Sequence, residues 1–391
     1  MKMKAVHKPQ NVSSADVIRK LQSHFKPSTL FRPWLETEAR ARKSERENKY
    51  TRKRRHNKNL DVKIGHGGTL DPLATGVLVT AIGKGTKQLN DFLGCTKTYE
   101  AVVVFGAETD SYDRVGKVVR RAPYEHITRE AVEEALGRFR GKIMQYPPVF
   151  SALKVNGKKM YEYAREGKVP PIEIQARPVE VSNLEMLEWY EPGSHEYQWP
   201  EEEAPEEEKS VAEKLLAKDD SLPVAPAVAE GDGEGQSTKR KSPPAPESPK
   251  EEANEATNTK KQKISEEGDA AHQPLETPSE NQQQQPTEQP LTTETPSNPN
   301  PNPAQPPAVK ITMTVSSGFY VRSLAHDLGK ALGSCGLMSE LVRTRQANFE
   351  LGPDKVLEYQ DLDAGEEVWG PKVKRFLEEW EAKREREVRT E

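Results

Sequence analysis

The stretch IGHGGTLDPLATGVLVTAIGKGTK, residues 64–87, carries a single acid, Asp71, although 31% of the whole chain is charged. Asp-Pro commonly begins a turn, so the plainest interpretation of this acid is a turn cap. A phosphate-binding loop needs the pattern G-x-x-x-x-G-K-[ST], but here Lys84 is followed by Gly85. No second acid or histidine stands at metal-ligand spacing from Asp71. The stretch therefore predicts neither a nucleotide-phosphate site nor a metal site.

Around this stretch the chain divides into a basic body and an acidic insert. Between Glu191 and Lys310 there are 25 acidic and 11 basic residues, a net charge of −14, so the other 271 residues carry +10. A basic body favours polyanionic partners. Residues 196–305 are rich in Pro, Glu and Gln and have no aromatic residue after Trp199, so they bury too little apolar surface to offset the entropy of ordering. We expect them to form a long disordered linker.

The linker is expected to split one catalytic body into residues 1–195 and residues 306–391. Structure is expected to resume at AVKITMTVSS, which alternates like a strand. A basic insertion at residues 31–58 interrupts the first part. Three interpretations of this insertion stay open, namely a solvated surface helix or loop, an RNA-contact arm and a nuclear-localisation signal.

Composition also bounds the compartment and the class of protein. Cys95 and Cys335 lack a C-x-x-C partner, which is typical of reduced thiols and gives no metal signature. No run approaches the roughly 18 apolar residues of a membrane span, and the N-terminus has neither an apolar signal core nor an Arg-rich transit sequence. The sequence therefore predicts an intracellular protein without a membrane segment.

Local patterns predict interspersed helices and strands. SSADVIRKLQSHF predicts a helix that begins with a capping box at Ser13 and Asp16. Further helices are predicted for TREAVEEALGRFRG, for FYVRSLAHDLGKALG and for the charged C-terminal tail, and strands for KTYEAVVVFGAET, GKVVRRA and RPVEVSNLEMLEW. These elements do not follow a strict βαβ order, so we expect an α+β fold, a mixed sheet with helices packed on it.

Several blocks of the chain resemble, in order, the motifs of the TruB family of pseudouridine synthases. GHGGTLDPLATGVL resembles the catalytic motif, and HKPQNVSSADVI resembles the N-terminal K-P-x-G-x-[ST]-S motif, with Asn11 where glycine is usual. Four later blocks resemble the strand pair, the block that follows it, the G-x-Y-[IV]-R-[ST] helix and the family's ending: KTYEAVVVFGAETDSYDRVGKVV, YPPVFSALKVNGKKMYEYAREG, SSGFYVRSLAHDLGKALG and LVRTRQANFELG. The resemblance covers most of residues 5–195 and 308–355.

The resemblance implies a fold, a reaction and a partner. The implied fold is the pseudouridine synthase fold, with a mostly antiparallel mixed sheet. The implied reaction is isomerisation of the T-loop uridine of tRNA, position 55, as in fungal members of the family, with the T-arm of tRNA as partner and messenger RNA left open as a second substrate. An isomerisation implies no redox, metal or nucleotide cofactor. The roughly 40 residues after Leu351 are too few for a PUA domain, so none is expected.

Asp71 acquires a role from this chemistry. Pseudouridine formation detaches uracil from ribose and rejoins it through C5, which needs a carboxylate that acts on the sugar or the base. Which atom is attacked stays open. We expect the apolar neighbours Leu70, Leu73 and Val77 to form a dry pocket that disfavours an unpaired charge. By resemblance, Arg322 supplies the compensating cation in a bidentate geometry, and Asp71 is the one acid of its stretch because a second carboxylate there would compete for that cation.

The other site residues are implied by resemblance alone. Tyr99 stacks on the target base, and its hydroxyl is a candidate for assisting removal of the C5 proton. His66 matches the family's histidine beside the flipped nucleotide, where displacement of the base or RNA contact is expected rather than catalysis. Four further residues complete the substrate-binding set: Lys87 and Lys154, which face phosphate or shape the pocket, Asp113, which braces its turn or pairs with a basic residue in the cleft, and Leu341, which lines the pocket.

Two other functions stay open. One is the catalytic subunit of a guide-RNA-dependent ribonucleoprotein, against which the expected absence of a PUA domain counts. The other is an RNA-binding chaperone that folds tRNA without catalysis, against which the joint presence of Asp71, Tyr99 and Arg322 counts. We expect a monomer. The basic runs KYTRKRR and TKRKSPP favour the nucleus, with the cytoplasm and mitochondrion left open.

Overall fold

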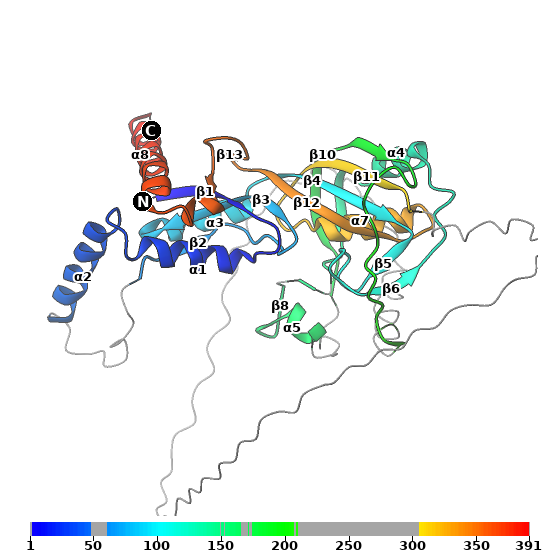
Figure 1. The fold of residues 1–391 in the computed structure, drawn as a ribbon, viewed down its shortest axis with the longest axis horizontal. Helices are drawn as coiled ribbons and strands as arrows, with labels where there is room; N and C mark the ends of the chain where they lie inside the picture. Colours follow the sequence, from blue (N-terminus) through cyan, green and yellow to red (C-terminus); the bar gives the residue numbers. More distant parts are fainter. Residues whose placement is uncertain are drawn as a thin grey trace, which may run out of the picture. The chain divides into compact units, whose positions relative to one another are not determined.

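The computed structural model describes residues 2–47, 61–206, 209 and 305–390, apart from residues 149, 152, 166–170 and 172–173. The chain divides into two units, one formed by residues 1–229 and 302–391 and the other by residues 230–301. The second unit lies outside the described residues, as does most of the predicted linker. Every element named below belongs to the first unit (Figure 1).

A ten-stranded sheet organises this unit. Its strands are β1 (Lys2–Lys8), β2 (Ile64–His66), β3 (Thr75–Ile82), β4 (Lys97–Phe105), β7 (Gly141–Gln145), β10 (Arg177–Tyr190), β11 (Ala308–Val315), β12 (Gly336–Gln346), β13 (Phe349–Glu350) and β14 (Leu357–Glu358). They run in the order β14-β1-β3-β12-β4-β11-β10-β7, with β2 paired to β3 and β13 to β12. Among the described strands of this sheet, only the β1–β14 and β12–β3 pairs are parallel. The predicted α+β class with a mostly antiparallel mixed sheet is confirmed.

Helices and two small hairpins complete the unit. They are α1 (Ser14–Phe25), α2 (Arg32–Glu47), α3 (Leu89–Gly94), α4 (Arg129–Gly137), α5 (Met160–Arg165), α7 (Val321–Ala331), α8 (Glu366–Thr390), the 3-10 helices η1 (Gly83–Gln88) and η2 (Tyr359–Leu362), and the strand pairs β5 (Ala107–Thr109) with β6 (Val118–Arg121) and β8 (Lys154–Val155) with β9 (Lys158–Lys159). Ser13 caps α1 as predicted, since its hydroxyl accepts the backbone N–H of Asp16 at 3.1 Å. Of the basic insertion, residues 32–47 form α2, and residues 48–60 lie outside the described residues. No helix in the described part of the chain is long and apolar enough to cross a membrane.

The opening stretch joins the two largest hydrophobic cores. The first core lies between β4, β10 and β11 and the helices α4 and α7, and it includes Leu70 and Leu73. The second joins α1, β1, β3 and α8, and it includes Leu78 and Ile82. Figure 1 shows α7 beside β12 and α8 beside β1. Residues 64–87 therefore connect the N-terminal and C-terminal elements to the central strands. Asp71 lies in the loop between β2 and β3.

Residues before and after the acidic segment share the sheet. β10 pairs with β11 in antiparallel register from Val181 opposite Val315 to Tyr190 opposite Ala308. The linker was expected to begin at residue 196, but residues 196–206 pack on the body instead. The indole Nε1 of Trp199 donates to the carbonyl of Phe105 at 2.7 Å.

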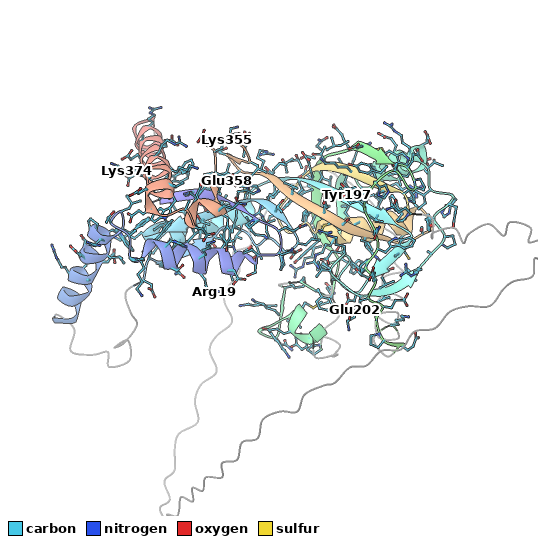
Figure 2. All side chains as sticks on the ribbon, in the orientation of Figure 1. Arg19, Tyr197, Glu202, Lys355, Glu358 and Lys374 are labelled. Atoms are coloured by element: carbon cyan, nitrogen blue, oxygen red, sulfur yellow. The ribbon has the colours of Figure 1, made fainter. Side chains whose placement is uncertain are left out.

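Two further backbone hydrogen bonds continue this segment along β6. Val118 donates to the carbonyl of Glu202, and Ala204 donates to the carbonyl of Val118, each at 2.9 Å. Tyr197 and Glu202, labelled in Figure 2, both lie on this segment. The two aromatic residues of the segment, Tyr197 and Trp199, pack against a smaller hydrophobic cluster formed by β4, β5, β6, β11 and β12. This explains why residues 196–206 belong to the folded body.

Candidate active site

The loop that carries Asp71 is held by the N-terminal motif. The Ser14 hydroxyl donates to the carbonyl of Leu70 and accepts its N–H, both at 2.9 Å. The Asn11 N–H donates to the carbonyl of Pro72 at 2.8 Å. Asn11 has a left-handed backbone with φ of 63°, a conformation that asparagine tolerates better than most residues. This explains how asparagine replaces the glycine usual at this place in the motif.

Arg322 reaches Asp71 from the start of α7. Its Nε donates to Asp71 Oδ2 at 2.8 Å, and its two terminal nitrogens donate to the carbonyls of Ser111 and Phe150, each at 2.9 Å. The expected bidentate pair is therefore wrong, because the guanidinium makes one hydrogen bond to the carboxylate and two to backbone. Only 7% of the Arg322 side chain is exposed. A planar cation with three separated acceptors is fixed in position and in direction.

Gln145 fixes the helix end from which Arg322 projects. Its side-chain amide donates to the carbonyl of Tyr320 at 3.0 Å, and its amide oxygen accepts the N–H of Tyr320 at 2.8 Å. The next residue after Arg322, Ser323, donates to the carbonyl of Tyr146 at 2.8 Å. The end of β7 therefore anchors the first turn of α7 through both backbone and side-chain groups.

Asp113 is a second carboxylate beside the same cation. Its Oδ2 lies 3.7 Å from Arg322 Nε, and 9% of its side chain is exposed. Burial raises the pKa of Asp113, against the opposing effects of the Arg322 charge and of hydrogen bonds from Ser111 and Val115. Asp71 is the one acid of residues 64–87, but Asp113 brings a second carboxylate to Arg322 from another segment, and it also accepts hydrogen bonds within its own turn.

Asp71 lies between buried apolar residues of its loop but is itself partly exposed. Leu70 and Leu73 are buried in the first core together with Tyr99, whereas Val77 belongs to a separate cluster. The Asp71 side chain is 37% exposed. The apolar neighbours expected around Asp71 are buried, but the carboxylate itself is not shut away from solvent and stays accessible to a substrate.

Tyr99 and Leu341 belong to the same hydrophobic core as Leu70 and Leu73. Tyr99 lies on β4 opposite Met313 of β11 and Arg343 of β12, and its side chain is buried. Leu341 on β12 is buried in the same core. The structure thus brings Asp71, Arg322 and Asp113 into direct contact and places Tyr99 and Leu341 in the core that supports them.

His66 lies on β2, where its surroundings favour the neutral form of the imidazole. Burial lowers its pKa, and the charge of Arg343 acts in the same direction. Arg343 donates from Nε to the carbonyl of Val77 at 2.7 Å and from a terminal nitrogen to that of Gly68 at 3.2 Å. The sequence interpretation did not single out Arg343, which braces both flanks of the loop that carries Asp71. The available signal was the arginine at the third position of the block LVRTRQ, but its burial becomes visible only in the structure.

Lys87 and Lys154 lie apart from this cluster. Lys87 is exposed on η1, and Lys154 is exposed on β8. Both side chains are accessible to solvent or to a polyanion, and among the described residues neither forms a hydrogen bond or ion pair with Asp71. The described part of the chain also contains no group of three or more His, Cys, Asp or Glu side chains placed to hold a metal ion.

Lys8 is a further support that the sequence interpretation missed. Its Nζ donates to the carbonyls of Pro9, Val12 and Pro72 at 2.8, 2.6 and 3.1 Å. Burial lowers the pKa of Lys8 to about 8, while nearby Asp71 acts in the opposite direction. One ammonium therefore ties the N-terminal motif to the proline that follows Asp71.

A matched pair of substitutions on β1 tests this support. We expect Lys8→Met to lower the free energy of unfolding by about 1–3 kcal/mol, because buried carbonyls lose their donor. Lys4 is the control, since it is also buried and its Nζ has no hydrogen-bond partner among the residues that the structure describes. Burial holds the pKa of Lys4 well below its usual range. Lys4→Met is therefore expected to stabilise the protein, by about 1 kcal/mol. Urea denaturation measures both, and equal effects would contradict the role of Lys8.

Comparison with known proteins identifies the family of the chain. Residues 53–199 match the model of the family described as TruB family pseudouridylate synthase (N terminal domain). The chain is 36% identical over 364 residues to tRNA pseudouridine synthase 4 of Schizosaccharomyces pombe, covering 92% of this chain and 82% of the relative. It is 31% identical over 383 residues to tRNA pseudouridine synthase 4 of Saccharomyces cerevisiae, covering 96% and 84%.

A solved structure of a Cbf5-Nop10-Gar1 complex matches with 16% identity and a TM-score of 0.42, over 93% of this chain and 54% of that one. Pseudouridylate synthase TRUB1 of Mus musculus is 38% identical over 189 residues, which is 48% of this chain and 50% of the relative. The two yeast relatives span most of this chain at more than 30% identity. The chain therefore belongs to the TruB family of pseudouridine synthases.

Proposed function

We propose that this protein isomerises the T-loop uridine of tRNA, position 55, to pseudouridine, with Asp71 acting on a flipped-out uridine. The observation that carries the proposal is an accessible carboxylate, Asp71, hydrogen-bonded at 2.8 Å to the buried and fully engaged Arg322. The names of the relatives that span most of the chain, both tRNA pseudouridine synthase 4, support tRNA as the substrate class.

The residues divide the chemical work. Arg322 orients Asp71, so that the carboxylate can act as the nucleophile on the sugar or the base. The bond between N1 and C1′ breaks and a bond between C5 and C1′ forms, while C5 loses a proton and N1 gains one. Tyr99 would stack on the base, and its hydroxyl is the candidate for assisting removal of the C5 proton. No oxidant, metal or cofactor is consumed by this exchange.

The RNA must present an unstacked base. Extruding a base costs a few kcal/mol in a duplex and least in a strained loop, which favours a T-loop over a helix. His66, neutral and beside the catalytic loop, would occupy the space that the flipped base leaves or contact the RNA. The exposed Lys87 and Lys154 would contact phosphates.

The wider assignments extend this proposal. We expect the protein to act as a monomer on a bare T-arm, and on messenger RNA where a loop reproduces the T-arm shape. The basic runs at residues 49–55 and 238–244 would direct it to the nucleus, with cytoplasmic and mitochondrial pools as further locations. Both runs lie outside the described residues.

Tritium release tests the proposal. Purified protein is mixed with a tRNA transcript that carries 5-tritiated uridine, without other proteins or RNA, and we expect close to one equivalent of tritium per tRNA. A transcript with cytidine at the T-loop position is the matched control and should release none. Release that requires a guide RNA, or equal release from the control, would contradict the proposed substrate. Tight binding without release would favour the chaperone function instead.

A further inference from the structure

A buried polar cluster lies one helical turn beyond Arg322. His326 stands four residues later on α7, on the same face of the helix, and 3% of its side chain is exposed. Its Nδ1 lies 3.2 Å from Glu108 Oε1, and the Glu108 side chain is fully buried. Arg120 donates to the other oxygen of Glu108 at 2.8 Å. The assigned reaction uses none of these three residues.

The cluster reaches the active site through one aromatic ring. Tyr112 stacks on His326, with ring centroids 4.2 Å apart and an interplanar angle of 10°. Tyr112 has a left-handed backbone with φ of 62°, which is costly for a residue other than glycine, asparagine or aspartate. Its neighbours in the chain are Ser111, whose carbonyl accepts from Arg322, and Asp113, whose carboxylate faces Arg322. The strained residue therefore lies between two groups that surround the guanidinium.

Backbone hydrogen bonds make this turn a rigid unit. Met338 of β12 donates to the carbonyl of Tyr112 and accepts from the N–H of Arg114, each at 3.0 Å. The Thr109 hydroxyl donates to the carbonyl of Asp113 at 2.7 Å. The orientation of the turn toward α7, by contrast, depends on side chains, and the Tyr112–His326 stack is one of these contacts. A small rotation of the turn would move the Ser111 carbonyl, which accepts from Arg322, and the Asp113 carboxylate, which lies 3.7 Å from Arg322 Nε.

Electrostatics hold the imidazole in place. Burial alone would raise the pKa of Glu108, but the hydrogen bond and charge of His326, followed by Arg120, outweigh it and lower that pKa. Glu108 thus remains a carboxylate that can orient the ring through Nδ1. Buried ion pairs contribute little net stability, so a role in specifying one conformation accounts for this cluster better than a role in stability.

We propose that His326, oriented by Glu108 and stacked on Tyr112, is a positioning residue that locks residues 109–113 against α7 and so keeps Arg322 aimed at Asp71. The proposal rests on the proposed function for one of its two readouts, the rate of pseudouridine formation. The other readout is the Nε–H nuclear magnetic resonance signal of Arg322, identified by its absence in Arg322→Lys. It reports the order of the guanidinium in free protein and needs no RNA.

Four variants separate positioning from stability. His326→Ala removes the imidazole and its contact with Glu108, and Tyr112→Asn removes the phenol ring but tolerates the left-handed backbone. We expect each to slow single-turnover pseudouridine formation by about 100-fold, the scale of an ångström misplacement, with tRNA affinity unchanged. His326→Phe keeps a ring against Tyr112 and should recover part of the rate. Leu377→Ala, buried in the second core far along the chain on α8, is the control and should keep the full rate.

The outcomes decide the proposal even where one variant does not fold. A slow rate together with an exchange-broadened or solvent-exchanged Arg322 signal supports it, and Tyr112→Asn alone suffices if His326→Ala is unfolded. A wild-type rate and an unchanged signal in the folded variants would overturn it, as would an equal loss of rate in Leu377→Ala. An inactive wild-type protein would refute the proposed function, while the resonance would still decide the positioning role.

Discussion

Replacing Asp71 by asparagine is expected to abolish pseudouridine formation, with a rate loss of about 10⁴-fold or more, while tRNA remains bound. Asparagine keeps the shape of the side chain and can still accept a hydrogen bond from Arg322 Nε. It lacks the negative charge that makes the carboxylate a nucleophile, so only the chemical step is lost. The loss of rate should be separate from any loss of folding, because the Ser14 hydroxyl and the Asn11 N–H hold the backbone of this loop and the Asp71 carboxylate is not needed for that.

Binding and folding are the controls for this variant. Filter binding of the same tRNA should give the wild-type affinity, since the phosphate contacts that dominate affinity do not involve Asp71. Thermal unfolding should match the wild-type protein closely. A loss of binding equal to the loss of rate would mean that Asp71 serves recognition of the RNA rather than catalysis.

Substitution of Arg322 has the second largest expected effect. Arg322→Lys keeps the charge, but one ammonium cannot reach Asp71, the Ser111 carbonyl and the Phe150 carbonyl in the directions that the guanidinium serves. We expect single-turnover rates to fall by about 10²-fold, as when one preorganised donor is removed. Arg322→Ala should be slower still. It leaves Asp113 without its cation, so the pKa of this buried carboxyl should rise further.

A double substitution shows whether the two residues act as one unit. If Arg322 works through Asp71, the Asp71→Asn, Arg322→Lys protein should be no slower than Asp71→Asn alone. Single-turnover assays with excess protein measure all three variants on one tRNA preparation. Additive losses would show instead that Arg322 acts directly on the substrate.

Local sequence patterns predict much of the fold. The side-chain cap at Ser13 forms because its signal is contained in four consecutive residues, although the reciprocal bond of a full capping box is not among the contacts of Asp16 in the described residues. The turn between β8 and β9 follows from Asn156 and Gly157, both in left-handed conformations, as the Asn-Gly pair predicts. The order of strands in the sheet does not follow from such patterns, because β12 reaches β3 and β4 across more than 200 residues.

Part of the site can also be predicted from the sequence, and part of it cannot. The pairing of Asp71 with Arg322 is expected from the family resemblance, and the structure contains it at 2.8 Å. The approach of Asp113 is hidden in the sequence, because its turn is positioned by β12 through the Tyr112–Met338 hydrogen bond rather than by neighbouring residues. The support from Lys8 is hidden as well, because its Nζ reaches the carbonyl of Pro72, 64 positions further along the chain.

The most direct test of the central claim is single-turnover tritium release from a T-arm transcript labelled only at the T-loop uridine, with wild-type protein and Asp71→Asn compared side by side. The account predicts release of close to one equivalent by the wild-type protein and no release above background by Asp71→Asn, at protein concentrations where both hold the RNA fully bound. Substantial release by Asp71→Asn would contradict the assignment of the catalytic carboxylate to Asp71.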